Sequence, residues 1–262
     1  MADAGPILAD LAAESGELDA LVARPDVDWS TPTPAQGWTI AHQIAHLAWT
    51  DAKALIAART PDDFPAERRR AADGGPGYVD DAARDGARAP RAELLATWRR
   101  GRADLAAALA EVPEGRRLPW YGPPMTAASM ATARLMETWA HAQDVYDALG
   151  VRRAPTARIR HVAHIGVRTR DFAFGLHGLQ APDEQFRVEL TAPDGGIWTW
   201  GPPDARQRVT GDALDFCLVV TQRRHPADTG LTAVGADAER WLHIAQAFAG
   251  PPGAGRKPGE RP

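Results

Sequence analysis

The sequence has almost no cysteine: Cys217 is the only one among 262 residues. A single thiol forms no internal disulfide and no metal cage built from several cysteines. This usage fits a reducing compartment, so we expect a cytoplasmic protein. Cys217 lies in the apolar run LDFCLVV, which predicts a small buried side chain rather than a nucleophile.

Lysine is also scarce, since only Lys53 and Lys257 among the 30 basic residues are lysines. We attribute this skew to a GC-rich coding sequence rather than to a charge requirement. The 34 acidic residues give the chain a net charge of −4. There is no general excess of positive charge to neutralise phosphates, so nucleic acid is not an expected partner.

Long hydrophobic runs are absent, and no stretch of about 20 apolar residues occurs. The N-terminal run MADAGPILADLAAE is acidic and lacks the basic start and apolar core of a signal peptide. We therefore expect neither export nor a membrane span. The motifs H-E-x-x-H, G-x-S-x-G, the P-loop and the Rossmann glycine pattern are missing too, so zincin proteases, α/β-hydrolases and nucleotide-binding folds lack their signatures.

What the chain does contain is a helical hydrophobic period over its first 178 residues. The helices expected on this spacing cover approximately residues 6–23, 39–58, 94–109, 126–149 and 155–179. Residues 60–88 are rich in Asp, Arg, Gly and Pro, which predicts an irregular crossover with one short helix at most.

The later part of the chain changes character. The runs FRVELTA, GGIWTWG and RQRVTG, with Gly and Asp turns between them, predict an antiparallel meander with two helices packed against it. We expect a helical bundle over residues 1–178, a small α+β domain over 179–250 and a disordered tail over 251–262.

Two pairs of polar residues stand four apart on the expected helices: His42 with His46, and Glu137 with His141. Residues at this spacing share a helix face, about 5–6 Å apart at Cβ. Such a pair is most often a solvated surface pair. Two such faces turned toward each other instead build the metal sites of helical bundles. Two imidazoles and one carboxylate leave coordination positions open, as in catalytic zinc sites and iron(II) facial triads.

The run GWTIAHQIAHLAWTDA, followed about ninety residues later by LMETWAHAQDVYDALG, resembles the metal-binding signature of the mycothiol-dependent maleylpyruvate isomerase family, which belongs to the DinB-like metalloproteins. The resemblance covers roughly residues 5–250. It implies a four-helix up-down bundle followed by a small α+β domain of the sterol-carrier-like type. Matched motif to motif, it implies that His46, Glu137 and His141 are the metal ligands.

The resemblance also implies an activity. A divalent ion, most simply Zn²⁺ with Ni²⁺ or Fe²⁺ as alternatives, would activate mycothiol for isomerisation or S-transfer on a small electrophile such as a maleylpyruvate-like acid. Arg223 in VVTQRRHP matches a family arginine that binds an anionic group of substrate or thiol, with Arg224 beside it. A pair of surface arginines is the alternative. A GC-rich source fits actinobacteria, which make mycothiol. For the oligomeric state, we expect a monomer or homodimer.

Some residues depart from the family pattern or stand outside it. His42 is a candidate catalytic residue that could be a fourth ligand, a proton shuttle or a support for a ligand; we favour support, because a fourth ligand would close the open position. Asp144, one turn beyond His141, is either an orienting acceptor for that imidazole or a surface charge.

Other histidines and tryptophans that could be functional have simpler structural explanations. His161 and His164 are three apart on a helix rich in arginine, which indicates an exposed face. Trp198 and Trp200 alternate on a strand and so share a face, where core packing between domains is expected rather than a substrate wall.

Two other functions remain open on the sequence. A metal-bound hydroxide would make the protein a hydrolase that needs no thiol. The three ligands could also belong to a protein that binds a metal or small molecule without catalysis.

Overall fold

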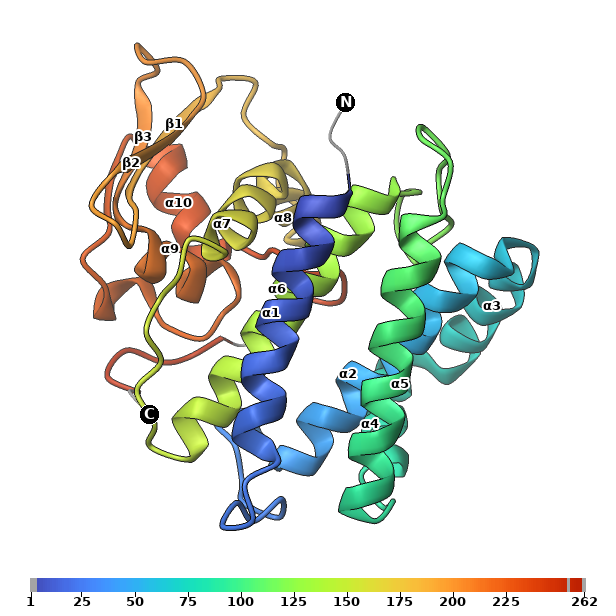
Figure 1. Ribbon diagram of the computed structural model, residues 1–262. Helices are drawn as coiled ribbons and strands as arrows, with labels where there is room; N and C mark the ends of the chain where they lie inside the picture. Colours follow the sequence, from blue (N-terminus) through green and yellow to red (C-terminus); the bar gives the residue numbers. More distant parts are fainter. Residues whose placement is uncertain (1–3, 254, 261–262) are drawn as a thin grey trace. The chain divides into compact units, whose positions relative to one another are not determined.

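The computed structural model describes residues 4–253 and 255–260 (Figure 1). The chain forms two compact units, Met1–Arg152 and Arg153–Pro262. The change of sequence character predicted a boundary after residue 178. Of the two helices between these positions, α7 (Ile159–Arg168) packs on α9 (Ala213–Val220) and α8 (Arg170–Leu176) packs on α10 (Ala236–Ile244), so both belong to the second unit.

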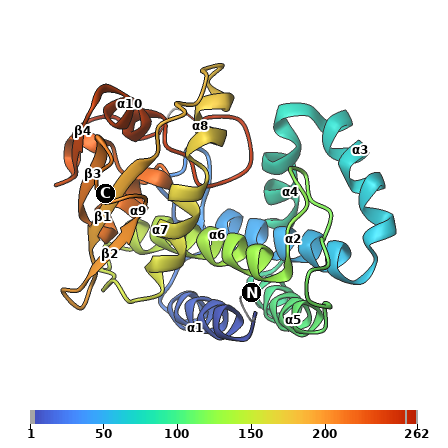
Figure 2. The same cartoon turned by 90° about the horizontal axis from the view of Figure 1, so that it is seen from above.

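The first unit is built on four long helices, α1 (Gly5–Val22), α2 (Ile40–Arg59), α5 (Arg91–Ala110) and α6 (Ala127–Ala148). Helix α2 packs on α5 and α6, while α1 packs on α6 and α5. Figures 1 and 2 show the resulting bundle. Its core holds large apolar side chains from these helices and the α1–α2 loop, among them Leu18, Trp29, Ile44, Leu47, Trp98 and Val145. The expected helical bundle is thus present.

Local sequence signals decide where the two central helices begin. Thr39 takes an extended conformation at the N-cap of α2 and forms a capping box with His42. Thr126 caps α6, because its Oγ1 accepts the Ser129 N–H at 3.1 Å. These caps fix the helical register of His46 on α2 and of Glu137 on α6.

The crossover over residues 60–88 is more regular than expected. It contains the short 3-10 helices η1 (Pro61–Asp63) and η2 (Gly75–Gly77), together with α3 (Phe64–Gly74) and α4 (Tyr78–Gly86). The prediction of one short helix at most was wrong, because proline and glycine stand at the starts and ends of these helices rather than inside them. Helix α4 lies against α2 at Gly86, where an added Cβ would be 2.9 Å from the Ala45 Cβ.

In the second unit the expected helix over 155–179 is divided at Thr169 into α7 (Ile159–Arg168) and α8 (Arg170–Leu176). A sheet follows, with β1 (Phe186–Thr191), β2 (Ile197–Trp200), β3 (Gln207–Asp212) and β4 (Thr232–Val234) in the order β2-β1-β3-β4. The 3-10 helix η3 (Pro226–Asp228) and helix α10 (Ala236–Ile244) complete the unit.

The expected antiparallel meander is wrong at one pair. β1 pairs antiparallel with β2 but parallel with β3, and β3 pairs antiparallel with β4. After β2 the chain turns at Gly201, at φ 75°, so close to β1 that an added Cβ would lie 2.0 Å from the Phe186 carbonyl oxygen. It then crosses to the other side of β1 and enters β3 in the same direction as β1.

The two tryptophans of β2 contact residues of the second unit; their expected packing between domains stays a prediction. Trp200 is opposite Val188 and Trp198 is opposite Leu190, so both rings lie on the buried face of β1. Trp200 Nε1 donates to His164 Nδ1 of α7 at 3.2 Å. On the same unit, Trp241 contacts Phe186 and Phe216 edge to face, each at 5.7 Å between ring centroids.

The predicted tail over 251–262 contains neither helix nor strand in its described residues, 251–253 and 255–260. The Gly259 N–H donates to the Asp228 carboxylate at 2.8 Å. Residues 254, 261 and 262 of that prediction lie outside the described residues. Among the described helices, none combines the length and apolarity needed to cross a membrane.

Gly166 allows α7 and α9 to approach closely, and this contact is testable. A Cβ at Gly166 would lie 2.7 Å from Cγ2 of Val220, which is fully buried. We expect Gly166→Ala to lower the free energy of unfolding by about 1–3 kcal/mol through overpacking. Chemical denaturation measures the change. The matched control is Gly175→Ala on α8, where the space around the new methyl is open; equal losses in both variants would contradict the packing argument.

Candidate metal centre

His46 lies in the second turn of α2, with 7% of the residue exposed. The rings of Trp38 and Trp49 flank it, at 5.3 and 6.3 Å between centroids. Trp38 also stacks on His141, with the ring planes 18° apart and the centroids 5.9 Å apart. Two indoles therefore cover the imidazoles of the site.

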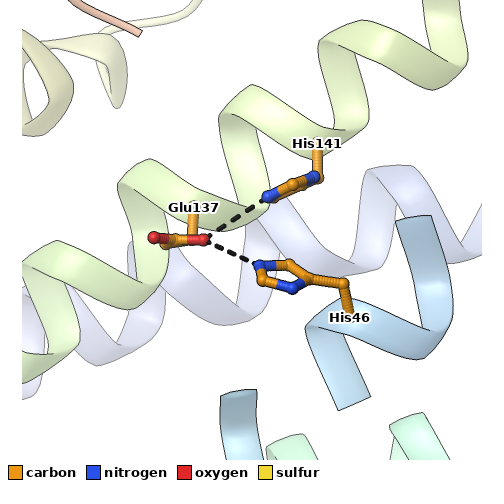
Figure 3. A group of neighbouring side chains, drawn as sticks. All are labelled: His46, Glu137 and His141. Atoms are coloured by element: carbon orange, nitrogen blue, oxygen red, sulfur yellow. Dashed lines mark hydrogen bonds and ion pairs between the residues drawn. The ribbon is translucent and has the colours of Figure 1, made fainter. Parts of the chain in front are cut away.

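Glu137 and His141 lie on α6, and the structure brings them together with His46 (Figure 3). Nε2 of His46 is 3.2 Å from Glu137 Oε2, and Nε2 of His141 is 3.4 Å from the same oxygen. One donor atom from each residue lies within 4.8 Å of the other two. The two helix faces inferred from the spacing thus face each other.

The electrostatics keep Glu137 ionised. Burial by itself raises the pKa of this carboxyl, but the hydrogen bonds and positive charge of His141 and His46 outweigh it, so its pKa lies well below the usual range. The guanidinium of Arg134 adds a fixed positive charge, with Nη1 4.0 Å from Glu137 Oε2.

The position of the ring proton on His141 indicates why the group of His46, Glu137 and His141 fits a cation. Its Nδ1 lies 2.5 Å from Gln43 Oε1, an atom that only accepts, so Nδ1 carries a proton. In the neutral ring, Nε2 then holds a lone pair that faces the Glu137 carboxylate. Two electron-rich atoms at this distance need a cation between them, which is either a second ring proton or a metal ion. The nitrogen and oxygen donors suit Zn²⁺, Ni²⁺ or Fe²⁺.

Gln43 was missed by the sequence analysis. It is fully buried on α2, three residues before His46. The available signal in the sequence was the spacing of three residues, which places the Gln43 amide on the same helix face as the candidate ligand His46.

His42 performs a different task from the three clustered residues. Its Nδ1 accepts the Thr39 backbone N–H at 3.2 Å and lies 2.9 Å from Thr39 Oγ1, which completes the cap of α2. Burial, followed by the charge of Arg84, lowers its pKa. The group that could hold a metal does not include His42, so the fourth-ligand alternative loses its support. Its catalytic role stays a prediction.

Asp144 lies one turn beyond His141 on α6 and is 1% exposed, so the alternative of a surface charge is wrong. Its orienting role stays a prediction.

Arg223 and Arg224 lie in the second unit, directly after α9. Gln222 adopts φ 61° at the end of that helix, and the Arg223 and Arg224 N–H groups then donate to the Leu218 carbonyl at 2.7 and 3.2 Å. Arg223 Nη1 donates to the Thr221 carbonyl at 2.7 Å. The anion-binding role of these arginines stays a prediction.

Cys217 matches its simpler explanation, whereas of the two histidines predicted on an exposed face His164 is exposed and His161 is half-buried. Cys217 is fully buried, its Sγ donates to the Ile159 carbonyl at 3.4 Å, and burial raises its pKa strongly. A buried thiol held protonated is a poor nucleophile. His161 and His164 lie outside the group that could hold a metal.

The crossover supplies two neighbours of the site that no sequence motif signalled. Tyr78 of α4 contacts Trp49 edge to face at 5.4 Å, and Trp38 Nε1 donates to Asp80 at 3.1 Å. Helix α4 therefore fixes both indoles that flank His46.

A buried ion pair supports the site and provides a test. Arg134 Nε donates to Asp51 Oδ1 at 2.9 Å, and both residues are at most 5% exposed. Burial raises the pKa of Asp51, while the charge and hydrogen bond of Arg134 oppose that rise. Replacing Arg134 alone leaves a buried carboxyl without its partner. We expect Arg134→Met to lower the free energy of unfolding by about 3–5 kcal/mol, measured by chemical denaturation.

The matched control for this variant is the double variant Arg134→Met with Asp51→Leu, which removes both charges. It should recover most of the lost stability, because apolar replacement of a whole buried pair is often neutral. A double variant as unstable as the single one would contradict the account.

Comparison with known proteins supports the relationship that the motifs suggest. Residues 11–146 match the profile described as the mycothiol maleylpyruvate isomerase N-terminal domain, and residues 182–234 match one described as wyosine base formation. Two Mycobacterium tuberculosis proteins, from the CDC 1551 and H37Rv strains and both described as uncharacterized, are 60% identical over 257 residues, covering 98% of this chain and all of theirs.

Solved structures show the same fold. The crystal structure of the mycothiol-dependent maleylpyruvate isomerase matches with a TM-score of 0.60 at 17% identity, over 88% of this chain and 93% of that one. A histidine-to-alanine mutant of that isomerase matches with the same TM-score at 16% identity and the same coverage. The chain belongs to the mycothiol maleylpyruvate isomerase family.

Proposed function

We propose that this protein is a metal-dependent enzyme that activates a low-molecular-weight thiol, mycothiol, for isomerisation or S-transfer on a small electrophilic acid of the maleylpyruvate type. The observation that carries the proposal is the convergence of His46 Nε2 and His141 Nε2 on Glu137 Oε2 in a member of this family. Three protein ligands leave coordination positions open for a reacting group.

The chemistry needs a cation and a thiol that the chain does not itself supply. A divalent ion held by His46, Glu137 and His141 would lower the pKa of a bound thiol and keep it as the thiolate at neutral pH. Cys217 is unsuited to be that thiol, because it is fully buried and its pKa is raised. An external thiol therefore fits this chain.

The residues of the chain have separate tasks in this proposal. Glu137 supplies the negative charge that offsets the cation; without a metal, the hydrogen bonds and charge of His141 and His46 lower the pKa of this carboxyl. Trp38 and Trp49 restrict the access of water to the His46 imidazole, which contacts both indoles. Arg223 and Arg224 bind a carboxylate of the substrate or the thiol, since guanidinium groups pair with carboxylates in a bidentate manner.

Metal content tests the ligand set. We expect mass spectrometry to find stoichiometric metal in the wild-type protein and a large loss in Glu137→Ala, because the only anionic donor of the group is gone. The matched control is Glu93→Ala, an exposed glutamate in the first turn of α5, which should keep its metal. Unchanged metal in Glu137→Ala would remove the proposed ligand set.

Thiol dependence tests the activity. We expect turnover of maleylpyruvate by the metal-loaded protein only when mycothiol is present, and loss of that turnover in His46→Ala. Turnover that continues without thiol and stops on chelation would instead indicate a hydrolase using bound hydroxide. A His46→Ala variant with unchanged metal, ligand binding and stability would indicate that the group has no catalytic task.

A further inference from the structure

A chain of hydrogen bonds leads from the loop before α2 to the ligand candidate His141. His141 Nδ1 lies 2.5 Å from Gln43 Oε1, and the Gln43 Nε2 donates to Thr33 Oγ1 at 2.9 Å. Thr33 Oγ1 in turn donates to the Trp38 carbonyl at 2.9 Å. Gln43 is fully buried, so these partners stand in for solvent.

The direction of each bond follows from the number of protons available. A hydroxyl carries one proton, and the Thr33 hydroxyl uses it on the Trp38 carbonyl. The oxygen of Thr33 can then only accept from Gln43, so the NH₂ end of the amide faces Thr33. The oxygen end of the amide therefore faces His141, which sets the proton on Nδ1 and leaves the lone pair on Nε2.

The opposite arrangement has a clear cost. If the Gln43 amide turned over, its NH₂ end would face His141 Nδ1, and the ring proton would move to Nε2. The Thr33 hydroxyl would then have to donate to the amide oxygen and would release the Trp38 carbonyl. That tautomer presents an N–H to the metal position, where a ligand needs a lone pair.

We infer that Gln43 is a positioning residue that holds His141 in its metal-binding tautomer, and that Thr33 fixes the direction of the Gln43 amide. The inference rests on the proposed metal-binding function. The same loop acts twice on His141, since its Trp38 ring stacks on the imidazole while its Trp38 carbonyl anchors Thr33. Ring orientation and proton position are thus set from one segment.

Zinc affinity of the full-length protein, measured by competition with a chromogenic chelator, tests this inference. We expect Gln43→Leu, which keeps the approximate volume but removes the acceptor, to weaken zinc binding by about 10–100-fold. Gln43→Glu restores an acceptor for the Nδ1 proton and should bind zinc within a few-fold of wild type. Thr33→Val removes the hydroxyl and should give an intermediate loss.

Two further measurements separate positioning from structural damage and from failure of the proposed function. ¹⁵N NMR of the metal-free protein, at a pH at which the His141 ring is neutral, should show its single ring proton on Nδ1 in wild type and in Gln43→Glu, but a mixture of tautomers in Gln43→Leu. This readout needs neither thiol nor turnover. The control Gln246→Leu alters another buried glutamine, 1% exposed in the second unit, and should leave zinc affinity unchanged.

The inference is overturned if Gln43→Leu keeps wild-type zinc affinity and the wild-type tautomer. It is also overturned if the neutral His141 ring of the wild-type protein carries its single proton on Nε2, or if Gln43→Glu loses as much affinity as Gln43→Leu. A protein that shows the expected tautomers but no thiol-dependent turnover would uphold the positioning role of Gln43 while rejecting the proposed activity.

Discussion

The packing of α2 against α6 in the first unit depends on the placement of one carboxylate oxygen. Glu137 Oε2 lies within 3.4 Å of a nitrogen from each of two imidazoles, on a side chain that is 21% exposed. A buried anion is costly unless positive charge surrounds it. The helices that carry these groups, α2 and α6, must therefore pack in one register, and the caps at Thr39 and Thr126 help to fix where that register starts.

Cationic side chains surround Glu137 Oε2 at two distances. His46 and His141 contact Glu137 directly, and Arg134 lies 4.0 Å away while it pairs with Asp51. Gln43 and Thr33 contribute no net charge, yet they decide where a proton resides. The bundle thus uses different residues to supply positive charge and to control the position of the proton.

The sequence predicted those elements of this arrangement whose apolar residues recur with the helical period. The helices carrying His46, Glu137 and His141 follow from their apolar spacing, and the order of the motifs indicated the family. The parts that depend on partners distant in sequence were missed. Nothing in residues 60–88 shows that Tyr78 meets Trp49, because that contact depends on how α4 packs on α2. The parallel pairing of β1 with β3 likewise depends on the path of the chain after Gly201, which strand propensity does not encode. His42 had the right spacing for a ligand, but its imidazole caps the helix instead.

Helix α4 packs closely on α2 at Gly86 and Ala45. As a result, the candidate ligands and the residues that contact the flanking indoles come from different segments of the chain. The candidate ligand atoms come from α2 and α6, whereas Tyr78 and Asp80, which contact the flanking indoles, come from the crossover. Substitutions in the crossover can therefore reshape the surroundings of the imidazoles while every ligand stays in place.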